Sequence, residues 1–366
     1  MVIVYVLASL GMGGAEKQVI ALAERMAERG HGVKLLVLRP QVKEQWPSKL
    51  PVIHLDMSWN PLSVLRGLDR AKRFLRGYRP DIVHGHCFHA NMLARLLKAF
   101  GNARIVVSTI HNVYEGGLHR MMLYRLTDFL CVQTTAVSAV ARERFVRLKA
   151  VPASKCVVLT NGIDTAEFAP DATRRAVMRK AMGVGDEFVW LTAGRIAPAK
   201  DIPNLLRAFA RVCEVYPDAQ LWVAGEGDAA QVKRVSGVAV DSGVWGRVRW
   251  LGLRRDVAAL MDAADGFVLA SAWEGMPLVV GEAMAMEKPV VATDVGGVGE
   301  LVGEAGSLVA SKDSEALAAG MLGMMRRSGK ERAEVGRGAR ERVVRAFDIE
   351  VRAEEWEGTY KSLLRG

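Results

Sequence analysis

The sequence predicts an α/β protein with two doubly wound units, each built around a parallel sheet. Short apolar, β-branched runs alternate with helix-like segments along the chain, and this alternation restarts after about residue 185. Strands that helices cover on both faces are apolar throughout, as these runs are. The chain has 366 residues, whereas a single hydrophobic core stops growing at roughly 250–300 residues. We therefore expect two domains, each with its own sheet.

The elements follow this alternation in order. In the first half, apolar runs predict strands at 2–8, 33–38, 82–85, 104–109 and 130–137. Helical patterns between them lie near 14–29, 62–77, 88–99 and 138–149. In the second half, we expect strands at 188–194, 220–225, 248–252, 266–271 and 289–293, with helices from Ile202, near 256–263 and from Pro277.

The joint between the two units lies in segment 160–170. Asn161 and Gly162 have turn chemistry, and Pro170 interrupts regular structure. We predict an N-terminal Rossmann-like domain at 1–165, a C-terminal Rossmann-like domain at 166–345, and a helix at 346–366 that packs back on the first domain. Ligands of such sheets bind beyond the carboxyl ends of the strands, so two facing units would form one cleft.

Positive charge is concentrated in the first half of the chain. The whole chain carries 50 Lys and Arg against 40 Asp and Glu, a net charge of +10. Residues 1–165 hold 23 Lys and Arg against 11 Asp and Glu, whereas residues 166–366 hold 27 against 29. This asymmetry indicates that the first half faces a polyanion, either nucleic acid or an anionic membrane.

Two basic segments favour the membrane. Segments 62–79 and 117–126 place Arg or Lys opposite apolar residues at helical spacing, as helices that lie on anionic lipid do. Core-facing helices with a solvated face share this pattern, and that alternative stays open. No recognised nucleic-acid-binding fold or aromatic platform accompanies the charge, so no nucleic acid partner is expected.

The N-terminus and the cysteines indicate a cytoplasmic protein. Residues 1–8 lack a basic region and a cleavage site, and they read as a buried strand rather than a signal peptide. No run of about 18 apolar residues is present, so no transmembrane helix is expected. The cysteines Cys87, Cys131, Cys156 and Cys213 are scattered without metal-ligand spacing, which is typical of reduced thiols.

The most informative stretch is Ser271-Ala-Trp-Glu-Gly-Met-Pro-Leu-Val-Val-Gly-Glu282. Proline suits the first position of a helix, so a helix is expected from Pro277 onwards. A helix N-terminus is a site for an anionic group such as a nucleotide diphosphate. Glu274 at the start of this helix and Glu282 about one and a half turns inside it can bind two parts of one ligand.

Two cations lie between the first strand of the second unit and the helix that follows it. Arg195 leaves the strand directly, and Lys200 precedes the helix from Ile202. Both are expected on the side of the sheet where Glu274 emerges. Positive groups there can stabilise the charge that collects on a departing pyrophosphate. Without them, Glu274 and Glu282 would repel a diphosphate, although surface cations alone are too common to be decisive.

A glycine-rich loop, Gly11-Met-Gly-Gly-Ala-Glu16, follows the first strand. It partly matches a dinucleotide fingerprint, but Glu16 stands where a third glycine is expected. The next strand ends at Arg39 rather than at an acidic residue, which leaves an oxidoreductase with a phosphorylated dinucleotide as a weaker alternative. A small loop at a helix N-terminus also suits the close approach of a phosphate or sugar. A plain tight turn is the remaining alternative.

Histidines follow two strands of the first half. His111, followed by Asn112, comes at the carboxyl end of a buried strand, where a ligand can reach it. An ordinary polar residue without a ligand is the alternative for His111. His84, His86 and His89 cluster around the end of the preceding strand. We expect these three side chains to point to different faces, and therefore predict no metal site. The chain also lacks an Asp-x-Asp motif.

With these residues assembled, the chain resembles the retaining glycosyltransferases of family four (glycosyl transferases group 1), which have the two-Rossmann GT-B fold. The resemblance runs essentially from end to end. Its most specific parts are Glu274-Gly-Met-Pro through Glu282, which matches the Glu-x7-Glu motif of the family, and Gly194-Arg195 with Lys200. Supporting parts are the glycine loop 11–16, Asn161-Gly-Ile-Asp164, Gly225-Glu-Gly227 and Tyr360-Lys-Ser-Leu-Leu364. Trp273 departs from the smaller residue that the family often has there.

The resemblance implies a role for each matching residue. Arg195 and Lys200 would neutralise the donor diphosphate, and Glu282 would hold the ribose hydroxyls. Glu274, with the backbone of Gly275, Met276 and Pro277, would position the donor sugar. Gly13 and Gly14 would approach the phosphates from the other domain, and His111 would contact the donor sugar near the reacting bond. Further donor contacts are expected from Glu226 and Leu253, and acceptor contacts from Gly11, Met12 and Asn112. The catalytic set is then His111, Glu274, Arg195 and Lys200.

The resemblance also implies the reaction. A hexose or N-acetylhexosamine would move from a nucleotide-diphosphate sugar, most commonly a UDP-sugar, with retention and without a metal or other cofactor. The acceptor would be a polyprenyl-diphosphate-linked sugar, another glycolipid or a glycan. The enzyme would act at the cytoplasmic face of the inner membrane, in polysaccharide or lipopolysaccharide biosynthesis. The alternatives are a UDP-sugar 2-epimerase of the same fold and a non-catalytic lipid- or polyanion-binding relative.

Overall fold

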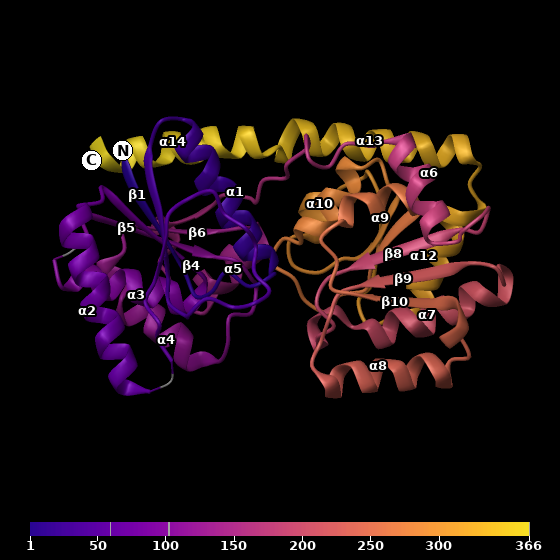
Figure 1. Cartoon of the computed structure of the whole chain (residues 1–366), viewed down its shortest axis with the longest axis horizontal. Coiled ribbons are helices and arrows are strands. Elements are labelled where there is room, and N and C mark those ends of the chain that lie inside the picture. The colour runs from indigo at the N-terminus through magenta and orange to yellow at the C-terminus, as the bar shows by residue number, and fades with distance from the viewer. Residues whose placement is uncertain (59, 102, 366) are drawn as a thin grey trace. The chain divides into compact units, whose positions relative to one another are not determined.

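The computed structural model describes residues 1–58, 60–101 and 103–365. It divides into two compact units: unit 1 contains Met1–Gly162 with Ile349–Gly366, and unit 2 contains Ile163–Asp348. The expected α/β class with two parallel sheets is confirmed (Figure 1). The chain passes between the units after Gly162 and after Asp348, whereas the sequence placed these boundaries after residues 165 and 345.

Unit 1 has a seven-stranded sheet in the order β3-β2-β1-β4-β5-β6-β7, and its paired strands are parallel. The strands are β1 (Val2–Leu7), β2 (Gly32–Val37), β3 (Val52–His54), β4 (Ile82–His86), β5 (Ile105–Ile110), β6 (Gln133–Ala136) and β7 (Cys156–Val158). The helices are α1 (Gly14–Glu28), α2 (Pro61–Tyr78), α3 (Cys87–Ala99), α4 (Leu118–Leu126), α5 (Ala139–Arg147) and α14 (Ile349–Arg365), with 3-10 helices η1 (Asp128–Leu130) and η2 (Ala153–Lys155). The run at 130–137 therefore forms a shorter strand than expected, because η1 occupies its start.

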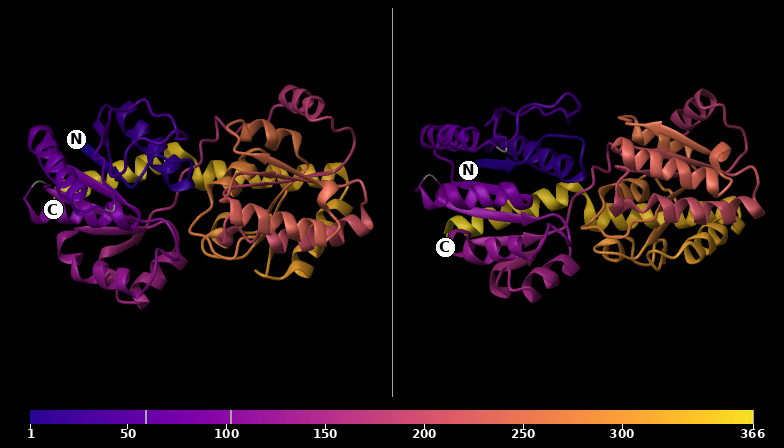
Figure 2. Two further views of the ribbon diagram at one scale, coloured as in Figure 1. Left: turned by 60° about the horizontal axis from the view of Figure 1, so that its bottom comes forward. Right: turned by 90° about the horizontal axis from the view of Figure 1, so that it is seen from below.

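Alternate side chains of β1 pack against opposite layers of unit 1. Ile3, Tyr5 and Leu7 share a core with residues of α1 and α14, whereas Val4 and Val6 share one with residues of α2 and α3. All five are at most 3% exposed, and burial of each aliphatic side chain contributes about 1.5–3 kcal/mol. Helices thus cover both faces of the sheet (Figure 2), which explains why this strand is apolar throughout.

The C-terminal helix α14 is fixed to the sheet of unit 1 by a buried network. Trp356 and Tyr360 lie in the same core as β1. The Tyr360 hydroxyl donates to the Tyr5 hydroxyl over 3.1 Å and lies 2.7 Å from Nδ1 of His84. Since a hydroxyl has one proton, His84 donates from Nδ1 to Tyr360. The Thr109 hydroxyl, 2.6 Å from Nε2 of His84, is the donor at the other ring nitrogen.

Unit 2 has a six-stranded parallel sheet in the order β10-β9-β8-β11-β12-β13. The strands are β8 (Val189–Ala193), β9 (Gln220–Ala224), β10 (Val248–Gly252), β11 (Gly266–Leu269), β12 (Val290–Thr293) and β13 (Ser307–Val309). The helices are α6 (Ala172–Ala181), α7 (Ile202–Val215), α8 (Ala229–Asp241), α9 (Val257–Ala263), α10 (Leu278–Ala285), α11 (Val298–Val302), α12 (Ser314–Arg326) and α13 (Gly329–Phe347), with η3 (Pro198–Lys200) and η4 (Trp245–Arg247). Pro277 is the N-cap residue of α10 rather than its first helical residue.

Unit 1 carries both the excess positive charge and a group of exposed apolar side chains. It holds 26 Lys and Arg against 14 Asp and Glu, and unit 2 holds 24 against 26. Leu118, Met122 and Leu126 on α4 and Phe129 in η1 are 56–78% exposed. Within the described ranges, no helix has both the length and the apolar composition that a membrane crossing requires.

Candidate functional site

Both sheets reverse their strand order at one point, and several of the expected ligand-binding residues follow the strands that flank it. The reversal lies between β1 and β4 in unit 1 and between β8 and β11 in unit 2. In doubly wound sheets, ligands bind beyond the carboxyl ends of the strands at such a point. β1 leads into the glycine loop 11–14, β8 leads to Arg195, and β11 leads to Glu274. The topology therefore selects the same loops as the sequence motifs.

In unit 2, two glycines let the segments that leave β8 and β9 run against each other. Gly194 has a φ of +143° and Gly225 a φ of +150°, values that residues with a Cβ rarely adopt. A Cβ on Gly225 would lie 1.9 Å from the carbonyl oxygen of Gly194. One residue beyond Arg195, the Ile196 N–H donates to the carbonyl oxygen of Glu226 over 2.8 Å. These backbone contacts on both sides of Arg195 fix the path of its backbone. The side chain of Arg195 is exposed and has no ion-pair partner among the described residues.

Lys200 and Glu274 come together at this point of unit 2. Nζ of Lys200 lies 2.6 Å from Oε1 of Glu274. The same oxygen accepts a hydrogen bond of 2.6 Å from the Ser271 hydroxyl, and the Ser271 carbonyl accepts one of 2.7 Å from Thr293. Glu274 is 8% exposed, and a carboxylate buried to this extent needs such partners. A predicted cation and a predicted carboxylate are therefore in direct contact.

The segment between Glu274 and α10 is held through its backbone. The Gly275 carbonyl accepts a hydrogen bond of 2.7 Å from the Gly297 N–H. Gly296 has a φ of +56°, and a Cβ there would lie 2.0 Å from the Glu274 carbonyl oxygen. The N-cap residue Pro277 provides no side-chain cap for α10. A helix start of this kind leaves backbone N–H groups for an anion.

The other predicted donor residues of unit 2 lie at the same edge of its sheet or in α10. Glu282 on α10 and Met276 before it are 7% and 6% exposed. Glu226 follows β9 and is exposed, and Leu253 follows β10 and is half-buried. β9 is the neighbour of β8, and β10 is the neighbour of β9. Glu226 and Leu253 therefore follow strands that lie on the same side of the reversal as β8, the strand before Arg195.

In unit 1, the glycine loop is a tight turn anchored by Trp46. The Gly13 N–H donates to the Gly11 carbonyl over 2.8 Å, and Nε1 of Trp46 donates to the Gly13 carbonyl over 3.0 Å. Met12, between the two glycines, is half-buried. α1 begins at Gly14 and has no side-chain cap. The loop thus presents mainly backbone groups, as contact with a phosphate or sugar requires.

His111 leaves the carboxyl end of β5, as expected, and rests on a buried carboxyl group. Its backbone N–H donates to Oε1 of Glu115 over 3.0 Å, and the Tyr124 hydroxyl donates to Oε2 over 2.8 Å. Arg120 donates to the backbone carbonyl of Glu115 over 2.8 Å. Burial raises the pKa of Glu115 to about 7, although the hydrogen bonds from Tyr124 and His111 and the positive charge of Arg120 lower it. Asn112, the next residue along the chain, is half-buried.

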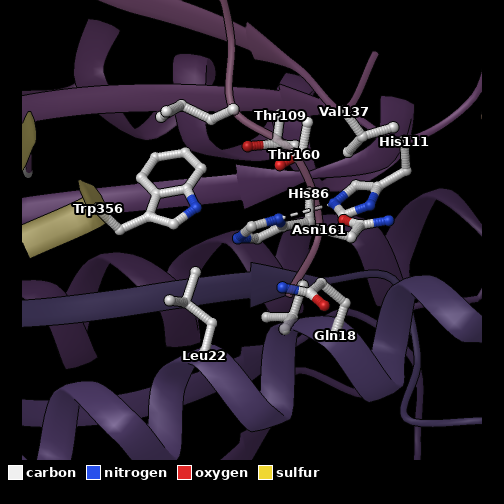
Figure 3. A pocket seen from close by; sticks show the side chains of 11 residues that line it. Gln18, Leu22, His86, Thr109, His111, Val137, Thr160, Asn161 and Trp356 are labelled. Atoms are coloured by element: carbon white, nitrogen blue, oxygen red, sulfur yellow. Dashed lines mark hydrogen bonds between the residues drawn. The ribbon is translucent and has the colours of Figure 1, made fainter. Parts of the chain in front are cut away.

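His84 and His86 correct the expectation that the clustered histidines diverge. Residues two apart on a strand lie on the same face, and the centroids of these two rings are 4.0 Å apart. Nδ1 of His86 lies 2.9 Å from Nε2 of His111 (Figure 3). Burial lowers the pKa of His86, and it lowers that of His111 to about 4. Both rings are therefore neutral near pH 7.

Three partners of the predicted residues were not foreseen. Ser271 and Glu115 are polar residues within four positions of a predicted site residue, and polar residues in loops are too common to be singled out by type. The contact of His86 could have been predicted, because His86 ends β4 and His111 directly follows the neighbouring strand β5. In the part of the chain that the structure describes, no group of three or more His, Cys, Asp and Glu side chains could hold a metal ion.

Comparison with known families and proteins identifies relatives of this chain. The family model of glycosyl transferases group 1 matches residues 187–327, and that of glycosyltransferase family 4 matches residues 12–167. The D-inositol 3-phosphate glycosyltransferase of Corynebacterium urealyticum is 30% identical over 316 residues, which cover 79% of this chain and 71% of that protein. The UDP-Gal:alpha-D-GlcNAc-diphosphoundecaprenol alpha-1,3-galactosyltransferase of Escherichia coli is 26% identical over 243 residues, 64% of this chain. The chain spans less than two thirds, 62%, of the length of that enzyme.

Solved structures share the fold over nearly the whole chain. Anabaena HepE, solved with UDP and glucose, superposes with a TM-score of 0.87 at 21% identity and covers 99% of this chain and 100% of its own. Sucrose-phosphate synthase of Thermosynechococcus elongatus superposes with a TM-score of 0.85 at 23% identity, with coverage of 100% and 99%. The two sheets, the family matches and these structures show that this chain belongs to the family four, group 1 glycosyltransferases with the GT-B fold.

Proposed function

We propose that this protein transfers a hexose or N-acetylhexosamine from a UDP-sugar to a lipid-linked or glycan acceptor, with retention of configuration and without a metal ion. The observation that carries the proposal is the group at the strand reversal of unit 2, where the exposed Arg195 follows β8 and Lys200 contacts Glu274. Relatives support it: the E. coli protein is a galactosyltransferase that uses UDP-Gal and a lipid diphosphate sugar, and HepE was solved with UDP and glucose.

The cations of unit 2 fit the leaving group of this reaction. Negative charge collects on the diphosphate as its bond to the sugar breaks, so positive groups beside it stabilise the transition state more than the bound donor. Arg195 has no ion-pair partner among the described residues, and a guanidinium can bind two phosphate oxygens at once. Lys200 is a second cation, held beside Glu274 at 2.6 Å. Together they provide the charge that a divalent metal ion provides in other phosphate sites.

The carboxylates of unit 2 fit the hydroxyl groups of the donor. Oε1 of Glu274 is occupied by Lys200 and by the Ser271 hydroxyl. Its Oε2 has no partner among the described residues and can accept a hydrogen bond from a sugar hydroxyl. Glu282, one turn into α10, is proposed to hold the ribose hydroxyls. The backbone of Gly275, Met276 and Pro277 and the nearby Glu226 and Leu253 complete the proposed donor contacts.

Unit 1 is proposed to act on the sugar and the acceptor. His111 would contact the donor sugar, and Gly13 and Gly14 would offer backbone N–H groups to the phosphates. Gly11, Met12 and Asn112 are the proposed acceptor contacts. Retention of configuration by same-face attack is part of the proposal.

The acceptor is proposed to lie in an anionic membrane at the cytoplasmic face. The support is the excess of positive charge in unit 1 together with the exposed apolar side chains of α4 and η1. Such a combination binds lipid by apolar insertion and by attraction to anionic headgroups. Flotation with vesicles of phosphatidylglycerol, compared with phosphatidylcholine alone, tests this part. Equal flotation with both lipids would contradict it.

A donor screen followed by a transfer assay tests the proposed reaction. UDP-, GDP- and dTDP-sugars are screened by thermal shift, because a ligand at 100 times its Kd stabilises the fold by about 2.7 kcal/mol. The best donor is then incubated with polyprenyl-diphosphate GlcNAc in the presence of EDTA. Proton NMR of the product reports the anomeric configuration. A product of inverted configuration, or transfer that requires a divalent metal, would refute the corresponding part.

The same assay separates the two alternative functions. A UDP-sugar 2-epimerase would convert UDP-GlcNAc to its 2-epimer in the absence of any acceptor. A non-catalytic relative would bind the nucleotide sugar but release neither UDP nor free sugar. Either result would replace the transferase proposal.

A further inference from the structure

His86 is a buried histidine that touches the proposed sugar-contacting residue His111. It ends β4, is 4% exposed, and its ring stacks on Tyr5 with centroids 5.7 Å apart. β4 and β5 pair in parallel with His86 opposite Thr109, which brings the residues at both strand ends together. Nδ1 of His86 and Nε2 of His111 are 2.9 Å apart (Figure 3). The pair is therefore fixed by the register of the sheet.

One proton lies between these two rings, and either ring can supply it. Both histidines are neutral, because burial lowers the pKa of each. A neutral imidazole has one N–H donor and one acceptor nitrogen. If His86 donates from Nδ1, its Nε2 is an acceptor and the proton of His111 is on Nδ1. If His111 donates from Nε2, its Nδ1 is an acceptor and the proton of His86 is on Nε2.

The surroundings of Nε2 of His86 distinguish the two arrangements. This atom is buried and has no hydrogen-bond partner in the described structure. The hollow beside it measures about 10 Å³, which is at the lower limit of the ~10–15 Å³ that a water needs. Leu22 and Trp356 line it together with polar residues such as Gln18, but none of these side chains makes a hydrogen bond to Nε2 of His86. Buried N–H groups without an acceptor are rarer in proteins than acceptors that lack a donor. The arrangement that leaves no proton on Nε2 of His86 is therefore favoured.

We propose that His86 donates its Nδ1 proton to Nε2 of His111 and thereby holds the proton of His111 on Nδ1. Nδ1 of His111 has no partner among the described residues and, unlike Nε2 of His86, is not fully buried, so it is open to a ligand. His86 is then a positioning residue, and His111 is a hydrogen-bond donor toward an oxygen such as that of a sugar hydroxyl. His111 cannot act as a general base in this state. The ligand part rests on the proposed transferase function, whereas the tautomer does not.

Histidine tautomers of the free protein test the proposal without any substrate. The full chain is labelled with 15N and 13C histidine, and the His111 signals are assigned by their loss in His111→Gln. The ring nitrogen shifts of His111 should report a protonated Nδ1 and an unprotonated Nε2. The exposed His119 on α4 serves as an internal reference for an unconstrained ring. A protonated Nε2 on His111 in the unmodified protein would overturn the proposal.

Two substitutions of His86 show whether it causes this tautomer. His86→Asn keeps an N–H donor near the position of Nδ1, and His86→Leu removes it. His111 should keep its Nδ1 proton in the first variant and lose this preference in the second. An unchanged tautomer in a folded His86→Leu variant would refute the role of His86. If that variant does not fold, the measurement on the unmodified protein still decides the direction of the hydrogen bond.

Kinetics with a UDP-sugar donor connect the tautomer to function. His86→Leu should reduce kcat by about three- to tenfold, the loss expected for one neutral hydrogen bond. The Kd for UDP should stay unchanged, because UDP lacks the transferred sugar that His111 is proposed to contact. His86→Asn should recover most of the rate. Equal losses in both variants, together with weaker UDP binding, would indicate a purely structural role. Failure of the transferase function itself would appear as no turnover in the unmodified protein, with the tautomer result intact.

Discussion

The two units hold their site residues by different physical means. In unit 2, Lys200 and Glu274 form an ion pair of 2.6 Å beside an exposed arginine. In unit 1, His111 rests on the neutral ring of His86 and on the buried carboxyl group of Glu115. Cations suit the binding and release of an anionic leaving group, whereas neutral donors and acceptors orient hydroxyl groups. Unit 2 should therefore be sensitive to loss of charge, and unit 1 to hydrogen-bond geometry and protonation.

The largest effect is expected from removal of the cations of unit 2. Arg195→Ala and Lys200→Ala should each lower kcat by about 10²–10³, the usual loss when one group that stabilises transition-state charge is removed. Arg195→Ala should leave the free energy of unfolding within about 0.5 kcal/mol, because its side chain is exposed. Initial rates at saturating donor and urea unfolding measure the two quantities.

A matched control is available on the surface of the same unit. Arg211 on α7 pairs with Glu315 at 2.6 Å, and both side chains are exposed, by 47% and 75%. Arg211→Ala removes one positive charge from unit 2 away from the strand reversal. It should keep the full rate. If Arg195→Ala were as active as this control, the proposed diphosphate contact would be wrong.

The glycines of the two units provide the next contrast. Gly225→Ala puts a Cβ about 1.9 Å from a backbone oxygen, at a φ of +150°. Strain of this kind costs about 1–3 kcal/mol before the backbone shift is counted, so we expect about 3 kcal/mol of destabilisation. On unit 1, the nearest atom to a Cβ on Gly11 is the Ser9 hydroxyl at 3.7 Å. Gly11→Ala should fold normally, as measured by thermal denaturation. Equal stability of the two variants would show that the close backbone approach at Gly225 does not require a glycine.

Much of unit 2 could be predicted because its signals are local in the sequence. Arg195 and Lys200 follow an apolar run directly, and Glu274 precedes a proline at a helix start. Residues that leave parallel strands at one edge of a sheet must come close to one another. The contact between Lys200 and Glu274 therefore needs only the order of the elements and the motif, both of which are visible in the sequence.

The hydrogen bonds of unit 1 depend on quantities that no local pattern contains. The contact between His86 and His111 requires the register in which His86 faces Thr109, and a shift by one residue would separate the rings. The buried Glu115 is bonded to the hydroxyl of Tyr124, which lies further along the chain on α4. The three-residue strands β3 and β7 are too short for a periodicity signal. Tertiary packing decides each of these features.

Glu115 makes the stability of unit 1 depend on pH. Its pKa is raised from 4.5 to about 7 in the fold, so the folded state binds more protons than the unfolded state between these pH values. The stability contributed by this group is therefore present below pH ~4.5 and lost as pH rises through about 7. The full change is about 3 kcal/mol. Glu115→Gln should remove this dependence.

Urea unfolding from pH 4.5 to 8 measures the effect as the difference between Glu115→Gln and the unmodified protein. The variant should gain relative stability as pH rises through this window. Glu143→Gln, at an exposed position on α5, is the matched control and should give a flat difference. A flat difference for Glu115→Gln as well would show that the buried carboxyl group is not protonated in the fold.

The smallest expected effect is the contribution of the ion pair of unit 2 to folding. Lys200→Ala leaves the carboxylate of Glu274, which is 8% exposed, with the Ser271 hydroxyl as its remaining side-chain partner at Oε1. Loss of one partner of a buried pair costs 3–5 kcal/mol, but the Lys200 side chain is 20% exposed. We therefore expect about 2 kcal/mol of destabilisation.

Glu274→Gln in the Lys200→Ala background removes the uncompensated charge and keeps an oxygen for Ser271. The double variant should recover about 1 kcal/mol relative to Lys200→Ala and remain inactive, because the leaving-group cation is still missing. Arg211→Ala with Glu315→Gln, at the exposed pair, should show no such recovery, since surface pairs contribute about 0–1 kcal/mol. If the double variant were no more stable than Lys200→Ala, folding would not require the charge on Lys200. The ion pair of Lys200 and Glu274 would then serve ligand binding without contributing to folding. The difference between this ion pair and the hydrogen-bonded site of unit 1 would then lie in function and not in stability.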